Sequence, residues 1–110
     1  MSFDSDLDIS LVDGEFPDFA SLKDKIVSQL NEDGIHPIVF DDLSSAFAQG
    51  RGHFRLHPAY LLNLLDKISQ LMPDVSFDAR GLGEEFRYTW IAEYREGRRA
   101  FTQGPWDYEF

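Results

Sequence analysis

Alternation of apolar and polar residues over positions 85–95 constrains the fold of this chain most strongly. The even positions carry the apolar side chains Phe86, Tyr88, Trp90, Ala92 and Tyr94. The odd positions are mostly charged, and a period of two is typical of a β-strand with one buried face. This stretch therefore predicts a long strand whose aromatic side chains belong to the core.

The residues that follow this strand predict a hairpin. Glu96-Gly97 is a two-residue turn signal, and the chain then returns as a strand over 98–103. Because neighbouring strands of one sheet share their faces, we expect Phe101 on the returning strand to join the same aromatic face.

The residues before the long strand predict a third strand. Positions 75–79 alternate in the same way, with Phe77 on the apolar side, and a glycine-bearing connection over 80–84 leads into the long strand. The three strands together predict an antiparallel β-meander over 75–103.

Two segments show helical periodicity instead. Residues 17–32 place apolar side chains three and four positions apart, at Phe19, Leu22, Ile26 and Leu30. Residues 58–72 do the same with Leu61, Leu64, Leu65, Ile68 and Leu71. Such spacing gives a helix one apolar face, so we predict two main helices that cover one face of the meander.

Shorter segments complete the pattern. Positions 7–11 alternate and predict an N-terminal edge strand, whereas 35–40 has β-like composition but contains a proline, which favours an edge strand or an extended connection. Residues 43–49 predict a short helix capped by the acidic pair before it, and 53–56 an extended segment. The aromatic tail, 106–110, is predicted to fold back onto the core, or else to offer a patch for a partner.

The fold class that follows is α+β, with an antiparallel β-meander covered on one face by two main helices. The chain has 110 residues, of which 43% are apolar and 15% aromatic, enough for one hydrophobic core. We therefore expect residues 1–110 to form one domain. Cysteine is absent, which excludes disulfides and thiolate chemistry.

Negative charge is concentrated in the first half of the chain. The net charge is −10, and residues 1–50 hold eleven acidic side chains against two lysines. Residues 51–110 hold nine acids and eight bases, so they are nearly neutral. A charge of this size repels nucleic acids and anionic membranes, and it accelerates encounter with a basic protein partner, although solubility alone would also explain it.

No catalytic, cofactor-binding or metal-binding signature is present. His53 and His57 are four residues apart, but the proline at position 58 places them before a helix, and no third ligand has matching spacing. Gly81 and Gly83 lack the third glycine of a dinucleotide-binding loop and precede a strand rather than a helix. We therefore predict no cofactor and no catalytic residue.

Arginines of the meander are explained by pairing within the sheet. They are Arg80, Arg87, Arg95, Arg98 and Arg99. Because Arg87 and Arg95 share the odd face with Glu85 and Glu93, we expect cross-strand arginine–glutamate pairs there rather than a basic patch for nucleic acid.

Targeting signals are missing from the N-terminus. It has no basic segment followed by an apolar one, and no apolar run approaches the ~20 residues needed to span a bilayer. We expect a soluble cytoplasmic protein.

In size, acidity and α+β pattern the chain resembles the small immunity proteins of bacterial contact-dependent growth inhibition and related polymorphic-toxin systems. The C-terminal stretch GEEFRYTW…EYREGRRAFTQGPWDY carries most of this resemblance. The resemblance implies a protein that is not an enzyme and that uses acidic side chains to block a basic, often nuclease, toxin domain.

Charge then predicts which residues contact the partner. They are Asp13, Glu15, Asp33, Asp41, Asp42, Glu84 and Glu85. Two alternatives remain open at this point. The same acidic surface could mimic nucleic acid and inhibit a DNA-binding protein, or a small enzyme could assemble an unrecognised site around His53 and His57.

Overall fold

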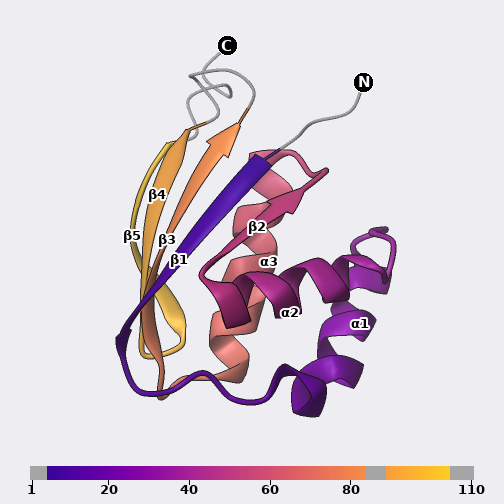
Figure 1. The fold of residues 1–110 in the computed structure, drawn as a ribbon, viewed down its shortest axis with the longest axis horizontal. Helices are drawn as coiled ribbons and strands as arrows, with labels where there is room; N and C mark the ends of the chain where they lie inside the picture. The colour runs from indigo at the N-terminus through magenta and orange to yellow at the C-terminus, as the bar shows by residue number, and fades with distance from the viewer. Residues whose placement is uncertain (1–4, 84–88, 105–110) are drawn as a thin grey trace.

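The computed structural model places the chain in two layers, a five-stranded antiparallel sheet and three helices on one of its faces (Figure 1). It describes residues 5–83 and 89–104. The elements are β1 (Ser5–Asp13), η1 (Phe19–Leu22), α1 (Lys23–Glu32), α2 (Val39–Gln49), β2 (Arg51–Phe54), α3 (Pro58–Leu71), β3 (Ser76–Gly83), β4 (Trp90–Arg95) and β5 (Arg98–Gln103). This arrangement confirms the predicted α+β class.

The N-terminal strand lies inside the sheet rather than at its edge. The strand order is β2-β1-β3-β4-β5, and β1 pairs antiparallel with both β2 and β3. The prediction of an edge strand was therefore wrong, because the short segment after α2 supplies a further strand that covers β1 on its other side. Leu7 and Ile9 of β1 are buried against the helices.

Strand β3 continues through the glycines that the sequence analysis assigned to a connection over 80–84. Gly81 lies opposite Trp90 of β4, and Leu82 and Gly83 pair with β1. A Cβ atom on Gly81 would overlap the indole ring of Trp90. The glycine therefore lets a buried tryptophan pack flat on the strand, a role for which local turn signals give no indication.

The hairpin between β4 and β5 forms at Glu96-Gly97 as predicted. Both turn residues have positive φ, 54° and 78°, which is the geometry of a two-residue turn that matches the twist of a hairpin. Trp90, Ala92 and Tyr94 of β4 are buried, which confirms that the even face of this strand belongs to the core. Phe86, Tyr88 and the tail 106–110 lie outside the described residues.

Phe101 is the exception to the predicted aromatic face, because it lies on the open face of the sheet with 48% of its surface exposed. The ladder pairs Tyr94 with Arg99 but Glu93 with Phe101, so Ala100 is an extra residue in β5. A one-residue β-bulge reverses the faces of every residue beyond it. Without the bulge, Phe101 would lie opposite Ala92 on the buried face.

The first predicted helix forms in two parts. Asp18 caps the 3₁₀ turn η1 by accepting a hydrogen bond from the backbone N–H of Ala20 at 3.1 Å, and α1 follows directly. Beyond α1, Gly34 has φ of +72° and reverses the chain. The second predicted helix, α3, begins at Pro58 as expected.

Residues 35–40 were predicted as extended chain, and this was wrong because α2 already begins at Val39. The N–H groups of Val39 and Phe40 donate to the carbonyls of His36 and Pro37, so the chain turns directly into the helix. Pro37 precedes the helix, where its missing N–H is not needed. Asp41 and Asp42 consequently lie in the first turn of α2 rather than at its cap.

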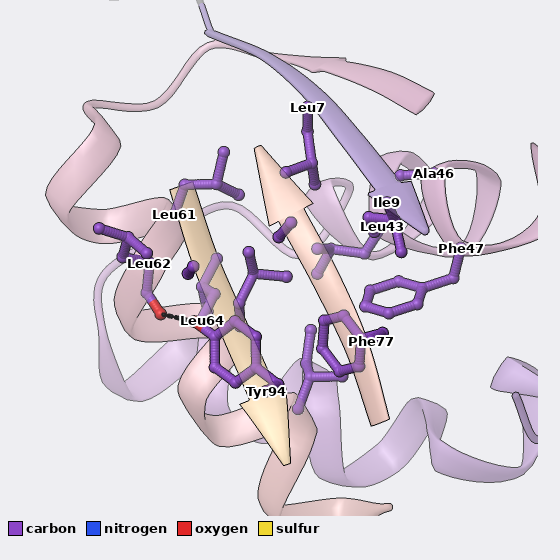
Figure 2. Packing of buried hydrophobic residues seen from close by; sticks show 14 of the residues in the cluster. Leu7, Ile9, Leu43, Ala46, Phe47, Leu61, Leu62, Leu64, Phe77 and Tyr94 are labelled. Atoms are coloured by element: carbon purple, nitrogen blue, oxygen red, sulfur yellow. Dashed lines mark hydrogen bonds between the residues drawn. The ribbon is translucent and has the colours of Figure 1, made fainter. Parts of the chain in front are cut away.

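Buried side chains from the sheet and all three helices form one core (Figure 2). Tyr94 is fully buried at its centre and stacks on Phe77 with ring centroids 4.8 Å apart. Its hydroxyl donates to Asp66 Oδ1 at 2.8 Å and approaches the carbonyl oxygen of Leu62 at 3.4 Å, which links β4 to α3. None of the helices in the described ranges is long and apolar enough to cross a membrane.

Replacement of Gly81 by alanine tests the packing of Trp90. Because the added methyl group would overlap the indole, we expect Gly81→Ala to lower the free energy of unfolding by about 1–3 kcal/mol in urea titrations. Ser10→Ala, at an exposed position of β1, should change it by less than about 0.5 kcal/mol. Equal stability of Gly81→Ala and wild type would contradict this packing.

The Tyr94 hydroxyl gives stability that depends on pH. Burial, together with the neighbouring Asp66 carboxylate, raises the pKa of Tyr94 above its ordinary value of 10.0. Folding therefore favours neutral tyrosine, and its contribution is complete below pH 10 and declines as the pH rises further, by up to about 1.4 kcal/mol per pH unit.

Tyr94→Phe should accordingly be less stable than wild type at pH 8, by about 1.5–3 kcal/mol for a lost hydrogen bond to a charged group. The difference in urea-unfolding free energy should shrink at pH 11, because only wild type carries this titration. A difference that is the same at both pH values would show that the hydroxyl bond is not what stabilises the core.

Candidate functional site

Two aspartates on the open face of the sheet are paired with arginines. On the open face, Asp8 lies between two neighbouring strands, with its carboxylate 2.8 Å from Arg80 Nη2 and 3.9 Å from Arg51 Nε. Asp78 Oδ1 is 2.9 Å from Arg95 Nη2. Cross-strand pairs between arginines and acids therefore occur on this face, but the predicted glutamate partner of Arg95 was wrong because Arg95 pairs with Asp78 of β3. Arg87 and Glu85 lie outside the described residues.

Acidic side chains between β1 and β2 are not neutralised in this way. Residues 13–49, called the acidic segment below, contain eight acids and two lysines. Within the described part of the chain, no ion pair joins any of these eight carboxylates to a cation. Lys23 instead lies over the ring of Phe40, 5.6 Å from its centroid. Most of the carboxylates that have no ion pair among the described residues therefore lie on this segment.

The structure brings together three of the predicted contact residues. Asp33 ends α1, and Asp41 and Asp42 lie in the first turn of α2, on either side of a short turn. Asp13 is the last residue of β1 and Glu15 follows on the connection to η1, and Figure 1 shows the end of β1 at the opposite end of the molecule from the α1–α2 turn. Glu84 and Glu85 lie outside the described residues.

A groove of about 420 Å³ lies beside Asp33, between the α1–α2 turn and the start of α3. Its lining consists of Asp33, Gly34, Ile35, His36, Val39, Arg55, Leu56 and Tyr60. The aliphatic members Ile35, Val39 and Leu56 pack against the core, which makes part of its wall apolar. Exposed apolar surface continues at the rim, where 57% of Tyr60 is accessible.

Ile38, in the same turn, is 62% exposed. It lies two positions before Phe40, so it falls on the opposite side of α2 from the buried stripe that Phe40 begins. This exposed isoleucine was not predicted, because residues 35–40 have the composition of an extended chain. An apolar patch rimmed by polar side chains is a common feature of a protein-binding surface.

Asp33 stabilises the fold little. Its Oδ1 accepts a hydrogen bond from Gln29 Nε2 at 3.1 Å, whereas Oδ2 is buried and has no hydrogen-bond partner among the described residues. The carboxylate also lies at the C-terminus of α1, where the helix dipole disfavours negative charge. Asp41 and Asp42 lie at the N-terminus of α2, where the dipole favours them.

A second groove, of about 440 Å³, opens on the sheet near Asp6 and Leu82. Its charges are balanced, because Arg51 and Arg80 lie beside Asp8 and His53 Nδ1 is 2.8 Å from Asp6 Oδ1. The carboxylates of this groove therefore already have partners, whereas Asp33 in the other groove has no ion pair among the described residues.

The two histidines proposed for an enzymatic alternative lie on different elements. His53 belongs to β2, whereas His57 caps α3 by accepting a hydrogen bond from the backbone N–H of Ala59 at 3.1 Å. Across residues 5–83 and 89–104, no group of three or more His, Cys, Asp or Glu side chains is placed to hold a metal ion.

Comparison with protein-family models, with curated proteins and with solved structures finds no match for this chain. The charges and contacts of the molecule itself are therefore the basis for assigning a function.

Asp33 lies at the C-terminal end of α1 and Asp41 in the first turn of α2, so the two residues form a matched pair for a stability test. We expect Asp33→Asn to raise the free energy of unfolding, and Asp41→Asn to lower it, each by about 0.3–1 kcal/mol at low ionic strength. Urea titrations measure both, and added salt should reduce both effects because it screens the helix dipole. Effects of the same sign would contradict this placement of the two carboxylates.

Proposed function

We propose that this chain is a binding protein that neutralises a basic partner, in the manner of an immunity protein that blocks a cognate bacterial toxin. One observation carries the proposal. Asp8 and Asp78 on the open face of the sheet are paired with arginines, whereas the acidic segment leaves all eight of its carboxylates without an ion pair among the described residues. Charge left uncompensated on one part of a surface is available to an oppositely charged protein.

The two kinds of surface at the α1–α2 turn have different roles in this proposal. Carboxylates of Asp33, Asp41 and Asp42 attract the partner from a distance and raise the association rate, an effect that salt weakens. Ile38 and Tyr60 supply apolar contact area, which determines how slowly the complex dissociates.

The groove beside Asp33 suits a lysine or arginine side chain of the partner. Its aliphatic wall can hold the methylene stem, and the ring of Tyr60 at the rim can lie against the cationic head. Asp33 then supplies the counter-charge, which accounts for an acid at a helix end where the dipole disfavours it. Arg55 also lines this groove, so the partner's cation is placed on the Asp33 side.

A toxin domain that acts on nucleic acid fits this chemistry. Such a domain must present a basic surface to the phosphate backbone, and a protein of net charge −10 competes for that surface. Inhibition then requires no catalytic group in the inhibitor. The cell that makes the toxin would need this inhibitor in its own cytoplasm.

The proposal is tested with the protein encoded by the reading frame immediately upstream, using its C-terminal domain as the probe. We expect a 1:1 complex by calorimetry, with a dissociation constant that rises steeply with NaCl concentration. The double variant Asp41→Asn/Asp42→Asn should bind at least tenfold more weakly, because it removes two charges from the proposed contact.

The matched control is Asp74→Asn/Glu96→Gln, which removes two exposed carboxylates from turns at the other end of the molecule. It should bind within twofold of wild type, and circular dichroism should show that both double variants are folded. Equal weakening by the two variants would indicate attraction by net charge alone. Absence of any complex with the upstream domain would remove the basis for the immunity function.

A further inference from the structure

Strand β5, at the edge of the sheet, has the opposite charge from the chain as a whole. Its sequence RRAFTQ holds two arginines and no acid, and all six residues are exposed. Within the ranges 5–83 and 89–104, β5 pairs with β4 and with no strand on its other side. An unpaired edge strand presents backbone N–H and C=O groups that can pair with another extended chain.

Arg98 is a cation without an ion pair in the described structure. It lies directly opposite Arg95, whose guanidinium is already engaged with Asp78 and with the carbonyls of Phe77 and Tyr94. Like charges opposite each other in a sheet are unfavourable. An anion placed beside Arg98 would therefore relieve a local repulsion.

Apolar side chains reach the same edge across the open face. Leu82, Ile91 and Phe101, on β3, β4 and β5, are 45%, 43% and 48% exposed. The register places Ile91 diagonally from both of the others, so the three form a stripe that ends at β5. A further strand beside β5 would lengthen this stripe and partly cover Phe101.

We propose that the β5 edge receives an extended, acidic segment of a partner protein as a sixth strand. Backbone hydrogen bonds to the edge would supply affinity, and side chains on alternate positions would supply selectivity. This surface is separate from the acidic segment and does not depend on the function proposed above.

Charge decides between an acidic segment and a second copy of the chain. Two β5 edges brought together would place four arginines in one ladder, and would join two molecules that each carry −10. Charged residues on an edge strand are a common protection against such self-pairing. An acidic strand meets the arginines of β5 with the opposite charge, and a short segment carries less negative charge than a second copy of this chain.

The bulge at Ala100 specifies the pattern of the incoming strand. On the other side of β5, the residues opposite Arg98 and Phe101 are Arg95 and Glu93, which are two positions apart. A strand added to the free edge would likewise face Arg98 and Phe101 with residues two positions apart. The expected motif is an acidic residue and an apolar residue separated by one other residue.

Random decapeptides displayed on phage provide the test. They are selected on the wild-type chain, and clones that also bind the Arg98→Glu variant are removed. We expect the surviving peptides to contain the acidic-x-apolar motif. A synthetic copy of the most enriched peptide should shift the amide NMR signals of β5, and its affinity for Arg98→Glu should be at least tenfold weaker.

Lys25→Glu is the matched control, because it makes the same charge change at an exposed position of α1 and should alter affinity less than twofold. No surviving peptide, survivors without acidic residues, or shifts confined to other elements would overturn the proposal. A dimer of the free chain with protected β5 amides would assign the edge to a second copy instead. None of these results bears on the basic partner of the acidic segment.

Discussion

The helices cover only one face of the sheet, and the rest of this structure depends on that constraint. Because all three helices lie on the same side, β4 and the first half of β1 alternate between a buried and an open position. Tyr94 and Trp90 take the buried positions, and Asp8 and Asp78 the open ones, where arginines are close enough to neutralise them. Most of the unpaired carboxylates among the described residues lie instead in the acidic segment.

Sequence predicts this fold where the period of two or of 3.6 is uninterrupted, as in β4 and α3, and where a turn has its own signal, as at Glu96-Gly97. It fails where a distant contact decides. The sequence around Gly81 indicates a loop, because the packing of Trp90 against this glycine is not a local feature. Phe101 is predicted to lie in the core, because a one-residue bulge has no local signature. Residues 35–40 have strand-like composition, yet they turn directly into α2.

The candidate site was likewise only partly predictable from the sequence. Charge counting along the chain predicts that the first half attracts a partner through residues that include Asp33, and the structure places Asp33 beside a groove. It does not distinguish Asp8, which is paired with arginines from neighbouring strands, from Asp41, which has no cation partner in the described structure. The groove joins residues 33–39 to residues 55–60, and contact between segments so far apart depends on the packing of α3, which no local pattern encodes.

The bulge at Ala100 has a consequence for how this molecule could change over time. Because every residue beyond it has exchanged faces, loss of one codon in β5 would move an aromatic ring from the open surface towards the core and bring a polar residue outward. At this edge, the number of residues in β5 therefore decides whether the aromatic ring lies on the open face or on the buried face. A lineage could gain or lose an exposed aromatic anchor there without a single amino-acid substitution.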